Sequence, residues 1–208
     1  MPWGLLLGIL LVFGCRSEPD APSSQAPAIV PAPPTLLVLH HSDDASGEHC
    51  FEHTRHVLAY AKIPYETTDL ATDPSLPALD SYRTVVVTTE RLGMLSIADA
   101  RRLLRFVEKG GGLAVLTRGW HPLLAPAFGH PTAFDPAFTL LPDEQLQFHG
   151  KLLEGAKNLT LDSLSLSMLD LGGTESDLAP TATVLASARR SGRPAAWLFS
   201  YGQGRTVF

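Results

Sequence analysis

Three short runs of apolar residues place the strongest limit on what this chain can fold into. The runs are Thr35–Leu39, Thr84–Thr88 and Gly112–Leu116. A strand that is apolar on both faces belongs inside a parallel sheet that helices cover on both sides. The sequence therefore predicts an α/β fold with a doubly wound, mainly parallel sheet of the flavodoxin type.

Two amphipathic segments supply the helices that such a sheet requires. The first is expected to run from Ser46, as N-cap, to about residue 61, with its apolar side chains on one face. The second begins after the N-cap Ser96, carries Asp99 in its first turn, and ends at Gly110. A short strand is predicted over residues 65–69.

The last part of the sequence is typical of antiparallel strands. Segments 183–187, 195–200 and 205–208 alternate with polar or glycine-containing turns, which predicts two C-terminal β-hairpins. Residues 120–142 hold five prolines and are expected to be irregular. The sequence ends within a predicted strand, so it leaves open whether the natural chain continues beyond Phe208.

Composition excludes several classes of protein. The 208 residues suit one domain with attachments, and 45% of them are hydrophobic, as in a folded core. Two cysteines cannot form a disulfide scaffold. The net charge is −5, with 16 Lys and Arg against 21 Asp and Glu and no clustered positive field in the sequence. We therefore predict no nucleic-acid partner and no cofactor.

The first residues indicate export and lipid attachment. Residues 1–14 carry no charged side chain, and the apolar run Leu5–Phe13 is shorter than the roughly 20 residues that a membrane span needs. Val12–Cys15 resembles the bacterial lipobox, which implies that Cys15 is lipidated, with palmitate among the expected acyl groups. An ordinary secretory signal with an incidental cysteine and an uncleaved anchor are the alternatives.

Residues 15–34 are predicted to form a tether between the lipid and a folded domain at 35–208. Six prolines occur within Arg16–Pro34, which favours an extended chain of about 3.1 Å per residue. The expected location is the bacterial cell envelope, with the lipid bilayer as partner through Cys15. Arg16 stands where aspartate marks inner-membrane retention in related lipoproteins, so the outer membrane is favoured.

Three segments of the domain carry a family resemblance. Thr84–Glu90, the glycine-rich helix exit Phe106–Gly112 that leads into a strand, and Tyr201–Val207 together resemble the class I glutamine amidotransferase-like α/β fold. The resemblance covers residues 35–208. It is nearest to non-catalytic bacterial members, including those that precede polysaccharide deacetylase-like domains. It implies an accessory to, or a part of, a glycan-modifying system.

The resemblance also implies where an amidotransferase would keep its catalytic pair. The nucleophilic cysteine follows the strand that corresponds to Gly112–Leu116, where this chain has Thr117. The partner histidine lies near the C-terminus, but no histidine follows His149. We therefore predict no catalytic residue and no transfer of ammonia from glutamine.

Polar residues follow each predicted parallel strand and form a candidate ligand site. Ligands bind at the carboxyl ends of such strands. The candidate binding residues for an envelope glycan or protein partner are His40, His41, Asp43, Asp44, Glu90, Thr117, Arg118, Trp120 and His121. The alternative is an ordinary set of polar loops in a purely structural module.

A histidine stripe on the first helix is a candidate metal site. His49, His53 and His56 have helical spacing, and two imidazoles one turn apart can share a transition metal. With the nearby aspartates they would suit a metal-dependent hydrolase. A solvated helix flank is the favoured interpretation. Cys50 falls on the apolar face and is expected to be an inert, buried thiol.

Overall fold

A computed structural model of the chain describes most of the domain that begins at residue 35. The described residues are 35–117, 120–129, 139–144, 146–149, 166–170, 178–188, 192 and 194–208. The predictions for Cys15, the tether and Arg118 lie outside them. In this part of the chain no helix combines the length and the apolar character needed to cross a membrane.

Strands and helices alternate over the first half of the domain. The elements of this half are β1 (Leu36–His40), α2 (Ala45–Tyr60), β2 (Tyr65–Asp69), β3 (Thr84–Val87), the 3-10 helix η1 (Glu90–Met94), α3 (Ile97–Glu108) and β4 (Gly112–Val115). The second half is mostly strand. Its elements are the 3-10 helix η2 (Pro122–Phe128), β5 (Thr139–Glu144), β6 (Leu146–Phe148), β7 (Leu166–Asp170), β8 (Thr183–Ala188), β9 (Pro194–Tyr201) and β10 (Gly204–Val207).

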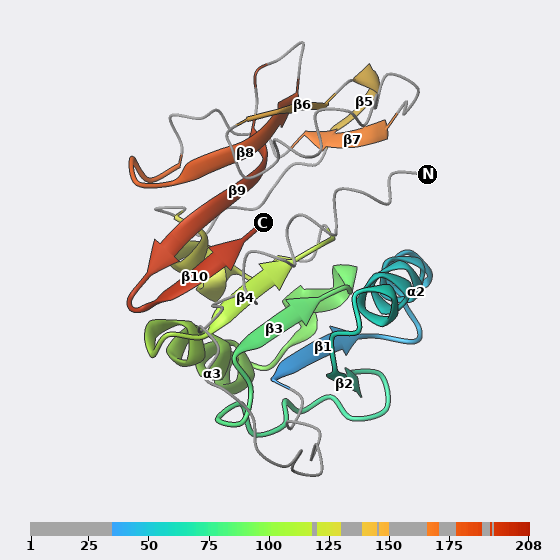
Figure 1. The fold of residues 1–208 in the computed structure, drawn as a ribbon, viewed down its shortest axis with the longest axis vertical. Coiled ribbons are helices and arrows are strands. Elements are labelled where there is room, and N and C mark those ends of the chain that lie inside the picture. Colours follow the sequence, from blue (N-terminus) through green and yellow to red (C-terminus); the bar gives the residue numbers. More distant parts are fainter. Residues whose placement is uncertain are drawn as a thin grey trace, which may run out of the picture.

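Eight of these strands form one sheet in the order β2-β1-β3-β4-β10-β9-β8-β6 (Figure 1). The strands from β2 to β10 in this order are mutually parallel. The strands from β10 to β6 pair antiparallel, and β5 pairs with β7 in a separate two-stranded sheet. The predicted α/β class and the two C-terminal hairpins, β8–β9 and β9–β10, are confirmed.

The three strands β1, β3 and β4 are buried on both faces, which explains their uninterrupted apolar sequences. Alternate side chains of each strand point to opposite faces of the sheet. On one face they pack with α2, in a cluster that includes Leu36, Val38, Val86, Phe51, Val57 and Leu58. On the other face they pack with α3 and η2, in a cluster that includes Leu37, Leu39, Val85, Val87, Leu103, Val107, Leu124 and Phe128.

The predicted N-cap residue of α3 is confirmed, and the predicted N-cap residue of α2 is not. Ser96 Oγ accepts a hydrogen bond from Asp99 N at 3.1 Å, as predicted for its N-cap. The predicted N-cap Ser46 of the first helix is wrong, because Asp44 holds that position and accepts from Gly47 N at 3.1 Å. A carboxylate is a strong N-cap, and this one also has partners on a distant strand.

The segment after Trp120 is more ordered than its prolines predict. The 3-10 helix η2 occupies Pro122–Phe128, with His121 as its N-cap and Gly129 in the left-handed conformation at its end. Its buried side chains, which include Leu124 and Phe128, complete the core on the α3 side. A proline at the first helical position is compatible with such a turn, because its missing N–H would have no partner there.

A close backbone approach joins β10 to the end of α3. A Cβ added at Gly204 would overlap the carbonyl oxygens of Val107 and Gly111. The neighbouring Gln203 N donates to Glu108 O at 2.9 Å. Glycine at position 204 therefore allows β10 to pair with β4 beneath the helix end.

Replacing this glycine should weaken the fold strongly. Gly204→Ala is expected to lower the free energy of unfolding by more than about 3 kcal/mol, because two backbone segments must separate. Gly192→Ala is the control: its φ is 69°, but nothing lies within 4 Å of the added Cβ, so the cost should be about 1 kcal/mol. Urea unfolding of the two variants measures the difference, and equal costs would contradict the close approach.

Candidate functional site

The order of the strands places a candidate site at the carboxyl ends of β1, β3 and β4. From β1 the chain leaves through α2 over one face of the sheet, and from β3 it leaves through α3 over the other (Figure 1). In open α/β sheets the ligand crevice forms at such a switch point. The loops at this edge contain the predicted residues His40, Asp44, Glu90 and Thr117.

Asp44 is at the centre of this edge and its carboxylate is used within the fold. The residue is only 8% exposed. One oxygen accepts from Gly47 N at 3.1 Å; the other accepts from Thr89 Oγ1 at 2.8 Å and from Glu90 N at 2.6 Å. Gly47 leaves room for it, since a Cβ there would lie 2.5 Å from Asp44 Oδ2. The carboxylate thus ties the beginning of α2 to the end of β3.

Hydrogen bonding also determines the charge of this carboxyl group. Burial alone raises the pKa of Asp44, but hydrogen bonds from Gly47, Thr89 and Glu90 and the charge of Arg91 outweigh it and lower the pKa. The group is therefore a carboxylate at neutral pH and has no proton to give to a substrate.

Thr117 lies at the turn after β4, where the sequence resemblance predicts the nucleophile of an amidotransferase. Its hydroxyl donates to the carbonyl oxygen of Thr89 at 2.8 Å. A peptide carbonyl is not a base that could remove the proton, so this contact positions the hydroxyl without activating it. The contact joins the turn after β4 to the end of β3.

A cysteine approaches the same turn from α2. Cys50 Sγ lies 3.8 Å from the carbonyl oxygen of Leu116. Burial raises the pKa of this thiol to about 11, and the charges of Glu90 and Asp44 add to the effect. At neutral pH the group is a protonated thiol, as expected of an unreactive cysteine, and the residue is half-buried rather than fully buried as predicted.

The two histidines after β1 are in different surroundings. The ring of His40 stacks on Phe51, with ring centroids 4.0 Å apart, and its Nδ1 lies 3.4 Å from Glu48 Oε2. His41 is buried, and among the described residues its Nδ1 has no hydrogen-bond partner. Asp43 is exposed, and its carbonyl oxygen accepts from Arg91 Nη2 at 3.0 Å.

His121 and Trp120 both take part in packing. His121 Nδ1 accepts from Leu123 N at 3.2 Å, and burial lowers the pKa of the ring although a hydrogen bond with the Leu95 backbone raises it. The Trp120 ring meets that of Phe208 edge to face, with centroids 5.4 Å apart. Both side chains therefore help to attach η2 to the core.

The histidine stripe lies on the outer side of α2. His49 and His56 are exposed, and the ring centroids of His49 and His53 are 4.2 Å apart. Burial, followed by the charges of His49 and His56, lowers the pKa of His53. Within the described ranges, no three His, Cys, Asp or Glu side chains converge in a way that could hold a metal ion.

The sequence analysis missed a cavity at the opposite edge of the sheet. A cavity of about 730 Å³ opens at the amino ends of β3, β4 and β10. Five cationic side chains line it: Arg83, Arg102, Arg105, Lys109 and Arg205. The premise that this chain has no clustered positive field is therefore wrong. The available signal was that Arg83 immediately precedes one predicted strand and Arg205 begins another.

The fold belongs to a recognised class. Its parallel sheet in the order 2-1-3-4, its glycine-rich exit from α3 and its C-terminal antiparallel strands form a class I glutamine amidotransferase-like α/β domain. No protein-family model and no curated protein matches the chain.

Three solved structures illustrate the likeness. A β-galactosidase from Rahnella sp. R3 matches 83% of this chain with 28% of its own, at a TM-score of 0.55 and 16% identity. An exo-β-1,4-mannosidase from Opitutaceae bacterium strain TAV5 matches 84% of this chain with 30% of its own, at a TM-score of 0.50 and 12% identity. A protein from Bacteroides uniformis that is named as ThuA-like matches 90% of this chain with 85% of its own, at a TM-score of 0.51 and 12% identity.

These identities establish the fold alone. The chain spans less than a third of the length of the two glycosidases, and their activities are properties of those whole proteins.

Removing the Asp44 carboxylate should destabilise the domain. Asp44→Ala is expected to lower the free energy of unfolding by about 2 to 4 kcal/mol, because α2 loses its cap and Thr89 and Glu90 N lose their acceptor. Asp44→Asn should cost less, since one oxygen acceptor remains. Asp43→Ala, at an exposed neighbour, should change stability by less than about 0.5 kcal/mol. Denaturant unfolding at neutral pH tests the series.

The Asp44 contribution should depend on pH in one direction. Its pKa is lowered in the folded protein, so its stabilisation is fully present above the ordinary aspartate pKa of about 3.9. It is lost as pH falls through the lower, folded-state pKa. The stability difference between the parent protein and Asp44→Asn should therefore shrink on acidification. A difference that grew below pH 4 would contradict the assignment.

Proposed function

We propose that this chain is a non-catalytic, membrane-tethered domain of a bacterial envelope lipoprotein and an accessory to, or a part of, a glycan-modifying system. The observation that carries the proposal is the turn after β4, where the Thr117 hydroxyl donates to the Thr89 carbonyl at 2.8 Å. A nucleophile at this position needs a base that takes its proton, and a carbonyl oxygen cannot do so.

The remaining groups at this edge support the same conclusion. Asp44 is committed to hydrogen bonds that join α2 to β3, and His121 caps η2. Cys50 has a pKa of about 11. No histidine follows His149 in the sequence to serve as the family's partner base. The polar groups at the carboxyl edge of the sheet, where amidotransferases carry out catalysis, therefore serve in this chain to attach helices and loops to the sheet.

The glycan part of the proposal draws on the similar structures. Two of them are named as a β-galactosidase and an exo-β-1,4-mannosidase, and this fold accounts for 28% and 30% of their chains. In both, a domain of this kind is one part of a larger protein that acts on a glycan. We extend that arrangement to this chain, with the domain as a non-catalytic part.

The envelope part of the proposal draws on the N-terminal sequence. Lipidation at Cys15 and a proline-rich tether over residues 16–34 would hold the domain at a bilayer surface, with the outer membrane favoured by Arg16. Two or more acyl chains give a stable anchor, because each buried methylene contributes about 0.8 kcal/mol.

The absence of amidotransferase chemistry is directly testable. The purified full chain should release no ammonia from glutamine above the buffer rate, and Thr117→Ala and Cys50→Ser should behave as the parent does. A working amidotransferase of the same class is the positive control. Ammonia release that Thr117→Ala abolishes would refute the proposal.

The anchor is tested separately by cell fractionation. In a bacterial host the parent protein should sediment with membranes, and Cys15→Ser should be found in the soluble fraction, because it has no thiol to lipidate. Cys50→Ser is the matched control and should still sediment. If Cys15→Ser sedimented as well, the lipid anchor would be rejected.

A further inference from the structure

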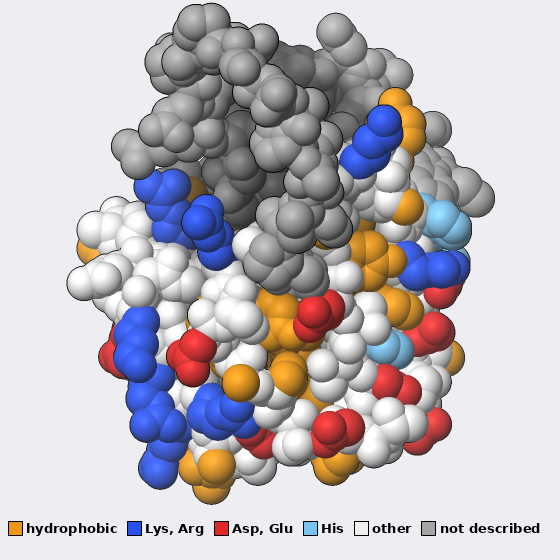
Figure 2. Space-filling model, turned by 60° about the horizontal axis from the view of Figure 1, so that its bottom comes forward, with side chains coloured by type: hydrophobic (Ala, Val, Ile, Leu, Met, Phe, Trp, Pro, Cys, Tyr) orange, Lys and Arg blue, Asp and Glu red, His pale blue; other side chains and the backbone are white. Residues whose placement is uncertain are grey.

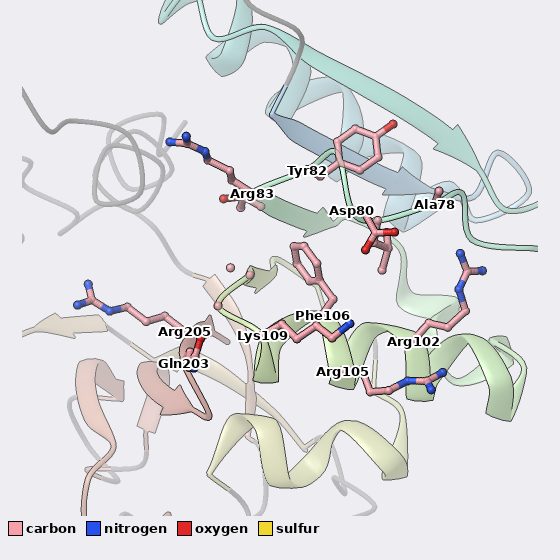
Figure 3. Close-up of a pocket in the computed structure, with 16 residues that line it drawn as sticks. Ala78, Asp80, Tyr82, Arg83, Arg102, Arg105, Phe106, Lys109, Gln203 and Arg205 are labelled. Atoms are coloured by element: carbon pink, nitrogen blue, oxygen red, sulfur yellow. The ribbon is translucent and has the colours of Figure 1, made fainter.

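The cavity at the amino ends of the strands has walls from separate parts of the chain. The loop before β3 forms one side, and the end of α3 with the turn before β10 forms the other (Figure 3). Its volume of about 730 Å³ is within the range of small-molecule sites. It lies at the opposite edge of the sheet from the residues that the family uses for catalysis.

The charges around this cavity are strongly unbalanced. Five of the chain's 16 Lys and Arg residues line it, and Asp80 is the one acidic residue among its lining. The whole chain has a net charge of −5, so this concentration of positive charge runs against the composition. Figure 2 shows Lys and Arg side chains gathered on the left of the face and Asp and Glu on its lower right.

One of the five cations builds the wall of the cavity. Arg102 Nη1 donates to Leu76 O at 2.7 Å and to Asp99 Oδ1 at 2.9 Å, and its Nη2 donates to Pro77 O at 2.6 Å. These bonds attach the loop before β3 to α3. Arg102 is therefore paired with a carboxylate, and three of its five donors are occupied.

The other four cations are available to a ligand. In the described part of the chain, the side chains of Arg83, Arg105, Lys109 and Arg205 form no ion pair. All four residues are exposed. An unpaired group of like charges is repulsive, and an anion placed among them would remove that repulsion.

The backbone fixes the points from which three of these cations extend. Arg83 N donates to Thr35 O at 2.7 Å, and Arg83 O accepts from Gly112 N at 2.8 Å. Lys109 caps α3, and Arg205 pairs with Gly112 in the β10–β4 ladder. A ligand would therefore have to order these side chains but not the backbone that carries them.

The arrangement of the side chains indicates an elongated ligand. Arg83 and Arg205 stand at one end of the cavity and Arg105 at the other, with Phe106 and Lys109 between them (Figure 3). A ligand that contacts the cations at both ends must carry negative charge at more than one point. Phe106 offers a partly buried aromatic ring between the charges, against which the apolar face of a sugar ring can pack.

We propose that this cavity binds an acidic oligosaccharide, with carboxylates held by the cations at its two ends and a sugar ring against Phe106. Guanidinium groups match carboxylates with two parallel hydrogen bonds. The anionic nature of the ligand follows from the cavity, whereas its being a saccharide rests on the proposed function. A nucleic acid fits less well, because the positive charge is confined to one cavity on an acidic chain.

Calorimetry on the purified full chain tests the ligand class. The probe is trigalacturonate, and galactotriose is its neutral control of equal length. Trigalacturonate should bind, more weakly at high salt because the charges are then screened, and galactotriose should not. No binding of trigalacturonate, or equal binding of citrate, would overturn the proposal. So would tighter binding of ATP or of a single-stranded oligonucleotide.

Two substitutions on one helix locate the site. Arg105→Gln should weaken trigalacturonate binding about tenfold, the effect expected from losing one charge-assisted hydrogen bond. Arg101→Gln makes the same charge change at an exposed residue of α3 outside the cavity, and should leave binding unchanged. Equal losses in the two variants would show a general charge effect and overturn the site.

A third substitution should act in the opposite direction. Asp80→Asn removes the one carboxylate in the cavity lining and should tighten trigalacturonate binding severalfold. A gain in affinity cannot result from misfolding, so this variant remains informative if the others are unstable. Weaker or unchanged binding would overturn the proposal. The ammonia-release and fractionation assays test the other parts of the proposed function without using this cavity. Equal binding of citrate and trigalacturonate would show an anion site without the glycan on which the saccharide assignment rests, so the two failures are distinguishable.

Discussion

The Asp44 carboxylate is the interaction on which the arrangement of this domain most depends. It caps α2 through Gly47 N and, across the switch point of the sheet, accepts from Thr89 Oγ1 and Glu90 N. One side chain thereby fixes α2, which covers one face of the sheet, relative to the end of β3. From there the chain continues into α3, which covers the other face. A buried carboxylate with three donors is stable only while all three remain in position, so the network also determines the shape of the carboxyl edge.

The two edges of the sheet use their polar groups differently. At the carboxyl edge the oxygens of Asp44, the hydroxyl of Thr117 and Nδ1 of His121 are committed to bonds inside the protein. At the amino edge Lys109 and Arg205 have no ionic partner among the described residues. A group that already has its partner gains little from a ligand, whereas a charge without an ionic partner remains available to one. We therefore propose that ligands bind at the amino edge of the sheet and not at the carboxyl edge, where amidotransferases of this fold have their catalytic residues.

The fold was predictable to the extent that its signals are local. Ser96 and Asp99 belong to one helix turn. The apolar run Thr84–Val87 by itself indicates a strand that is buried on both faces, whatever its neighbours in the sheet. The N-cap of α2 was predicted wrongly because Ser46 and Asp44 are both good capping residues. The choice between them depends on Thr89, 45 positions further along the chain. The five prolines of residues 120–142 concealed η2, although Pro122 stands at its first position, where a proline sacrifices no hydrogen bond.

The sequence by itself determined the α/β class, the buried strands, the helices and the lack of a cysteine in the turn after Leu116. These follow from hydrophobic periodicity and residue type, which act over a few neighbouring positions. Only the tertiary structure decided that Asp44 serves the fold and that Arg83, Arg105, Lys109 and Arg205 meet around one cavity. Those cations are separated by as much as 122 positions in the chain. The parallel strands bring them together, because residues at the starts of neighbouring parallel strands share one edge of the sheet.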